Sequence, residues 1–240
     1  MNSYRKTAII VGILFLLTEI TSITGLLLYH PILNDPNYII KNPVNEAQVL
    51  WGAFCEVMLV FVNIGTAITL FPVLKKYNES MALGAVCFRV LEAIIIIIGI
   101  ISLLAIVTLN HEFLKEINPN TSFYLIAGKL LLTIHNWTFL FGPNLVLGPS
   151  TFFTAYLLYK SKLISPVIAI LGMIGGPLIS ASSLLVMFGV FLQISVWGAV
   201  LALPVFGYEV SLAIWLLVKG FNSPIIADDL STKITQFGRD

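Results

Sequence analysis

Long apolar runs separated by short polar connections form the main pattern along the chain. An α-helix needs about 20 mostly apolar residues to cross roughly 30 Å of hydrocarbon. Runs long enough to cross occupy residues 7–28, 49–74, 81–109, 164–191 and 194–218. The pattern therefore predicts an all-α, polytopic integral membrane protein.

A further apolar region at 123–159 has no clear polar break. It is too long for one perpendicular crossing and too short for two, and Lys129, His135 and Asn136 place polar groups in its first third. We expect an interfacial helix at about 123–136 and a crossing at 137–159 that begins at Trp137, because tryptophan is enriched at bilayer interfaces. The prediction is a bundle of six transmembrane helices with one extra interfacial helix before the fourth crossing.

Basic residues lie unevenly around these crossings. If the N-terminus is cytoplasmic, the inside positions are Arg5, Lys6, Lys75, Lys76, Lys160, Lys162, Lys219, Lys233 and Arg239, and the outside positions are Lys41, Lys115 and Lys129. Loops rich in lysine and arginine remain in the cytoplasm, so we expect both termini there. The expected organisation is one transmembrane domain over residues 1–221 and a polar cytoplasmic tail over 222–240.

Composition narrows the class of protein further. Hydrophobic residues make up 58% of the 240 and charged residues only 10%, with a mean hydropathy of +0.96, whereas soluble domains carry roughly 25% charged residues. A net charge of +1 gives no basic patch for nucleic acid. The expected partner is the lipid bilayer of the cell membrane, and no cofactor or metal motif is present.

Charged residues inside the apolar runs are the strongest candidates for function. Each charge near the centre of a membrane helix costs about 2.5–3.5 kcal/mol on insertion scales. Counting about 1.5 Å per residue from the helix ends places Arg89, Glu92 and Glu209 at similar depths, and Glu92 shares a helix face with Arg89. Two interpretations remain open: a buried ion pair that holds the helices in register, or a surplus carboxyl group that binds a proton or cation.

A second group of polar residues is expected nearer the external side. Glu19 and Glu56 are predicted at comparable depths, within reach of His135. Carboxylates and an imidazole can form a metal site, but their spacing matches no known motif, so no metal is predicted. This outer cluster is the basis for an alternative interpretation of the protein as a membrane-embedded hydrolase or transferase.

Prolines and small residues interrupt the later crossings. Pro143, Pro177 and Pro204 are candidate kinks or hinges, because proline lacks a backbone donor and collides with the preceding turn. Gly172 and Gly176 have the spacing that lets membrane helices approach closely. That close contact could form within one bundle or between two copies of the chain.

Several segments resemble an uncharacterised prokaryotic family of membrane proteins, domain of unknown function 4386. The resemblance spans about residues 5–221 and is carried by segments 70–79, 84–93, 137–143, 156–161 and 209–221. It implies a six-helix integral membrane protein of bacteria or archaea, without an established activity. Arg89, Glu92, Pro143 and Glu209 fall on the family pattern.

The leading hypothesis from the sequence is a non-enzymatic protein. It would bind or transport a small ligand or a proton, or act as a sensor or partner subunit in the membrane. The alternatives are the membrane enzyme described above and a purely structural or interaction protein. The sequence leaves the oligomeric state open.

Overall fold

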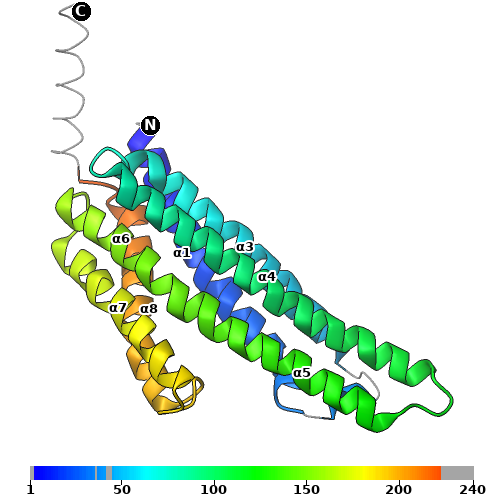
Figure 1. The fold of residues 1–240 in the computed structure, drawn as a ribbon. Helices are drawn as coiled ribbons and strands as arrows, with labels where there is room; N and C mark the ends of the chain where they lie inside the picture. Colours follow the sequence, from blue (N-terminus) through cyan, green and yellow to red (C-terminus); the bar gives the residue numbers. More distant parts are fainter. Residues whose placement is uncertain (1–2, 36, 42–44, 223–240) are drawn as a thin grey trace, which may run out of the picture.

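The computed structural model describes residues 3–35, 37–41 and 45–222, and these ranges contain helices and connections without any strand (Figure 1). The elements are α1 (Ser3–Leu28), α2 (His30–Leu33), the short 3₁₀ helix η1 (Tyr38–Ile40), α3 (Glu46–Leu74), α4 (Glu79–Lys115), α5 (Thr121–Leu140), the π-helical segment η2 (Phe141–Val146), α6 (Leu147–Lys160), α7 (Pro166–Met187) and α8 (Val196–Val218). Nearly all of the predicted tail lies outside the described residues.

Six helical segments are long and apolar enough to cross a membrane, which confirms the predicted fold class. They are Tyr4–Leu28, Glu46–Leu74, Glu79–Lys115, Thr121–Lys160, Pro166–Met187 and Val196–Val218. Large apolar side chains are exposed on the outer faces of these helices, as is typical of a surface covered by lipid. The side of the membrane on which the termini lie stays a prediction.

The fourth crossing differs from its prediction, because no separate interfacial helix exists at 123–136. Helix α5 continues through η2 into α6 as one helical element from Thr121 to Lys160. Pro143 removes the backbone donor that would normally bond to Phe139 O, and the Asn144 side-chain amide donates to that carbonyl instead, at 3.3 Å. The wider π turn accommodates Pro143, so the helix continues into α6. The helix is also unbroken at Trp137, where the crossing was expected to begin.

The helices form two groups that diverge from each other. Helices α3, α4 and α5 run side by side, whereas α7 and α8 form a hairpin that packs against α6 and α1 (Figure 1). The hairpin and α5 separate toward the 188–195 connection between α7 and α8. A cavity near this connection is lined by residues of α5, α7 and α8.

Two apolar cores lie at opposite ends of the bundle. The terminal core gathers near the described chain ends and contains, among others, Val11, Phe15, Leu158, Leu212 and Leu216. The loop core lies beside α2 and η1 and contains, among others, Tyr29, Ile32, Val49, Leu103 and Tyr124. Buried polar residues of α1, α3, α4 and α8 lie between these two cores.

Glycines bring α7 into close contact with α6 and α8. A Cβ atom on Gly176 would lie 2.5 Å from Gly148 O in α6, and one on Gly175 would lie 2.7 Å from Val205 N in α8. No side chain fits at such distances, so the small residues permit backbone contact. Of the two alternatives left open by the sequence, these glycines serve packing within one bundle.

Candidate functional site

Arg89 lies at the centre of the buried polar layer and joins three helices. Its Nη2 donates to Glu209 Oε1 of α8 at 2.6 Å, and its Nη1 donates to Asn63 Oδ1 of α3 at 2.6 Å. Nη1 also lies 3.4 Å from Glu92 Oε2, one turn along α4. All four side chains are almost completely buried. The structure thus brings together Arg89, Glu92 and Glu209, the three residues expected at similar depth.

Glu19 of α1 joins this group, contrary to its expected place beside Glu56 and His135. Its carboxyl group lies beside that of Glu209, close enough for one hydrogen bond when either group carries a proton. Glu19 is only partly buried, whereas Glu209 is 5% exposed. We call Glu19, Asn63, Arg89, Glu92 and Glu209 the charged cluster.

The axial register between α1 and α3 explains the position of Glu19. A Cβ atom on Gly25 would lie 3.0 Å from Glu56 Cγ, so Gly25 and Glu56 are at the same level. Glu19 precedes Gly25 by six residues and therefore lies about 9 Å deeper than Glu56 along these antiparallel helices. Depths counted from the ends of apolar runs could not reveal this offset.

The charged cluster contains more acidic groups than its one basic group, Arg89, can neutralise. Three carboxyl groups surround one guanidinium, so the cluster would carry a net charge of −2 if every carboxyl group were ionised. An uncompensated charge is costly inside a membrane. Two neighbouring carboxyl groups can hydrogen-bond to each other only through a proton, because an ionised carboxylate is only an acceptor. The geometry between Glu19 and Glu209 therefore provides a place for a proton.

A cavity of about 190 Å³, which we call the charged cavity, adjoins the charged cluster. Its walls include Glu19, Arg89, Glu92 and Glu209, together with Pro143 from the π-helical segment. Several water molecules or a small chemical group would fit in this volume. The carboxyl groups therefore face a space that can be hydrated, which lowers the cost of placing them in the membrane.

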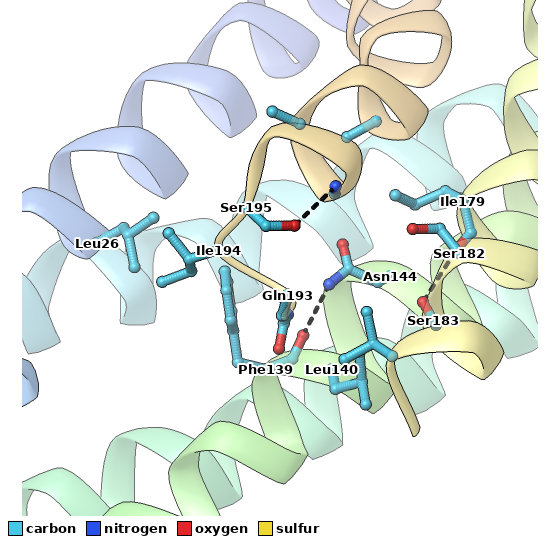
Figure 2. A pocket seen from close by; sticks show the side chains of 14 residues that line it. Leu26, Phe139, Leu140, Asn144, Ile179, Ser182, Ser183, Gln193, Ile194 and Ser195 are labelled. Carbon is cyan, nitrogen blue, oxygen red and sulfur yellow. Dashed lines mark hydrogen bonds between the residues drawn. The ribbon is translucent and has the colours of Figure 1, made fainter. Parts of the chain in front are cut away.

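A second cavity, which we call the vestibule, lies beside the charged cavity and the 188–195 connection (Figure 2). Its volume is about 300 Å³, and it shares the wall residues Phe139, Asn144, Ile179 and Ala202 with the charged cavity. The two cavities are therefore neighbours, separated by few side chains. The vestibule opens where the α7–α8 hairpin diverges from α5.

Uncharged polar groups line part of the vestibule. Ser182 is 5% exposed, and Figure 2 shows its hydroxyl group directed toward Asn144. Within the described residues that hydroxyl makes no hydrogen bond, and Gln193 Nε2 is buried without a partner. The adjacent Ser183 differs, because its hydroxyl group donates to Ile179 O at 2.9 Å. Ser182 and Gln193 thus retain hydrogen-bonding capacity for a ligand or water.

Glu56 and His135 form a separate group with Tyr29, which we call the tyrosine cluster. The Tyr29 hydroxyl donates to Glu56 Oε2 at 3.0 Å, and its ring meets the His135 ring edge to face at a centroid distance of 5.8 Å. Burial and the nearby Glu56 raise the pKa of Tyr29, so its hydroxyl stays protonated and remains a donor. The free space between Glu56 and His135 is only about 10 Å³.

The sequence prediction did not identify some residues of these sites. Tyr29 continues the polar face of α1 that Ser22 and Gly25 begin, so the helical period offered a signal for it. Asn63 shares a face of α3 with Glu56 and Thr66, so the helical period offers a signal for it too, but its pairing with Arg89 depends on tertiary contact. Ser182 and Gln193 had no local signal.

The remaining predicted residues have the following positions. Pro143 contacts both the charged cavity and the small space beside His135, whereas Pro177 and Pro204 lie within continuous helices and line neither space. Among the residues that the structure describes, no three His, Cys, Asp or Glu side chains are arranged to hold a metal ion. Cys55 and Cys87 are free thiols.

Comparison with known proteins places this architecture in a family. No match was found among curated proteins, and none among solved structures. The sequence profile of one family, described as Domain of unknown function (DUF4386), matches residues 10–220. That range includes both polar clusters and the vestibule, and it covers most of the chain. The chain, with its six helices that can span a membrane, therefore belongs to the DUF4386 family.

Proposed function

We propose that this protein is a carrier in the prokaryotic cell membrane, and that its charged cluster binds a proton during transport of a small solute. The observation that supports this proposal best is the contact between Glu19 and Glu209 beside Arg89. One proton between the two carboxyl groups satisfies both of them. Its loss creates a negative charge that favours entry of a cation into the adjoining cavity.

A purely structural ion pair explains less of this arrangement. One carboxylate is sufficient to neutralise Arg89, and the Glu209 contact at 2.6 Å already supplies it. Glu19 and Glu92 add further acids at a site where charge is costly. Intramembrane acids of this kind mark ion pathways and proton relays, and a cavity of about 190 Å³ lies beside them.

Proton binding can be tested without knowing the solute. Infrared difference spectra of the purified protein, recorded in a series from about pH 5 to pH 9, report whether a carboxyl group gains or loses a proton. We expect a carboxylic-acid band that disappears in both Glu19→Gln and Glu209→Gln. Glu56→Gln is the matched control, because Glu56 is also buried but accepts a hydrogen bond from Tyr29. An unchanged band in both cluster variants would overturn the proposal.

Transport itself requires a second measurement. Proteoliposomes that contain a pH-sensitive dye and a mixture of small cations should acidify faster than empty liposomes under an inward proton gradient, because the carrier exchanges an inside cation for an outside proton. We expect Glu19→Gln and Glu209→Gln to lower that rate at least tenfold, with Glu56→Gln close to wild type. If the folded cluster variants and wild type give equal fluxes, the carrier interpretation fails.

A further inference from the structure

We infer that the vestibule and the charged cavity together bind a small organic cation with an ammonium N–H group and a second, hydrogen-bonding end. This inference rests on the proposed proton site, because the ammonium group would replace the proton shared by Glu19 and Glu209. The two cavities share Phe139, Asn144, Ile179 and Ala202. A ligand can therefore extend from one cavity into the other.

The charge of the site favours a cation over an anion. Among the described residues, Arg89 is the only basic one that lines the charged cavity, and its two terminal nitrogens are already bonded to Asn63, Glu92 and Glu209. An anion would therefore meet acids without an available basic group. An ammonium ion would balance the charge left when the shared proton departs, so the exchange is electrically neutral.

The side chains also favour an ammonium group that carries N–H bonds. Carboxylate oxygens accept such hydrogen bonds, and charge-assisted bonds of this type are the strongest available. Quaternary ammonium groups are instead recognised by cages of aromatic rings. In the part of the chain that the structure describes, the aromatic wall residues of the two cavities are Phe139 and Phe206, which are too few for such a cage.

The vestibule selects the second end of the ligand. Gln193 Nε2 is buried without a partner, and the Ser182 hydroxyl, directed toward Asn144 in Figure 2, makes no hydrogen bond within the described residues; both residues line this cavity. A hydroxyl or amine on the ligand can satisfy them. The vestibule volume of about 300 Å³ is at the lower end for small-molecule sites, so the ligand is small.

Ethanolamine, which is an ammonium ion near neutral pH, is a suitable probe because it carries both required ends. Added to the full-length protein in detergent at weak buffering, it should bind and release about one proton per protein, as measured by calorimetry together with a pH electrode. Tetramethylammonium and sodium should bind at least tenfold more weakly. Ethylamine should bind several-fold more weakly than ethanolamine, because it lacks the hydroxyl group.

Two variants separate the vestibule from the proton site. Ser182→Ala should remove most of the preference for ethanolamine over ethylamine, a change of about two- to tenfold for one hydrogen bond, and should leave the infrared proton signal intact. Ser183→Ala is the matched control, since its hydroxyl group is bonded within its own helix. It should preserve the preference for ethanolamine.

The outcomes distinguish this inference from the proposed function. If the infrared proton signal is present but neither amine binds or displaces a proton, the ligand class is wrong and the proton site stands. Equal binding of tetramethylammonium and ethanolamine would also overturn the inference, as would selective binding of sodium. If the proton signal itself is absent, the proposed function and this inference fail together.

Discussion

The charged cluster and the tyrosine cluster place the same residue type, a buried glutamate, in two different settings. Glu56 has a neutral donor in Tyr29 at 3.0 Å, and the free space beside it is about 10 Å³. Glu209 has a cation in Arg89 at 2.6 Å, a second acid in Glu19, and a cavity of about 190 Å³.

The difference shows how a membrane protein can use a buried acid for structure or for chemistry. A carboxyl group that is matched by one donor in a filled space has no room for a ligand, so it contributes packing and position. Acids in excess of their cation, beside open volume, can exchange a proton or bind a cation. Four substitutions in or beside the two clusters can break or sharpen this comparison.

The largest effect is expected from Arg89→Gln. Removing one partner of a buried ion pair costs about 3–5 kcal/mol, because it leaves the other charge uncompensated. Thermal unfolding in detergent should show a strongly lowered Tm or loss of monodisperse protein. Arg89→Lys should recover part of the stability, since it restores the charge without the fork of donors. If Arg89→Gln had the same Tm as wild type, Arg89 would not be the group that balances the buried carboxylates.

An intermediate effect is expected from Tyr29→Phe. This change removes the hydroxyl group that Glu56 accepts from, and an unsatisfied buried polar group costs about 1–3 kcal/mol. Chemical unfolding of the variant in detergent measures this loss. In the Tyr29→Phe, Glu56→Gln double variant, the two effects should be non-additive because the residues are in direct contact. Proton flux should stay near wild type, and a large loss of flux would place the tyrosine cluster in the transport path.

The smallest effect on stability is expected where the cavities leave room. Ala202→Val adds two carbons at the wall shared by the vestibule and the charged cavity, so stability should change by less than about 1 kcal/mol. Gly52→Val adds a branched side chain where even a Cβ atom would lie 3.0 Å from the Tyr29 ring. It should cost about 1–3 kcal/mol through overpacking.

The effects of these two variants on ligand binding should have the opposite order. Ala202→Val, the milder change for stability, should have the larger effect on binding. Ala202→Val narrows the passage between the cavities and should reduce ethanolamine binding severalfold. Gly52→Val disturbs only the tyrosine cluster and should leave that binding close to wild type once the protein is folded. Binding calorimetry on both variants tests this distinction. If Gly52→Val alone lost ethanolamine binding, the binding site would lie at the tyrosine cluster and the inference would be wrong.

Much of the fold was available from local patterns in the sequence. The apolar runs identified the six crossings, with several boundaries within a few residues of the observed helix ends. The spacing of Arg89 and Glu92 and the depth of Glu209 predicted that these side chains can meet. Local period and length are properties of one helix, so they need no knowledge of its neighbours.

Two expectations failed where neighbouring groups decide the outcome. A break before Trp137 was expected from the length and polarity of the fourth apolar region. The helix continues because a π turn accommodates Pro143, and Asn144 supplies a donor to Phe139 O. Glu19 was expected beside Glu56, but the contact between Gly25 and Glu56 shifts it to the level of Arg89.

The sequence by itself determined that this chain is a six-helix membrane protein with acids facing its interior, because hydrophobicity and helical period act locally. The tertiary structure alone decided which acids share Arg89, since that choice depends on the axial register of antiparallel helices. It also decided that Ser182 and Gln193 line a vestibule next to those acids. Residues from separate helices line that cavity, at the end of the bundle where the α7–α8 hairpin lies apart from α5.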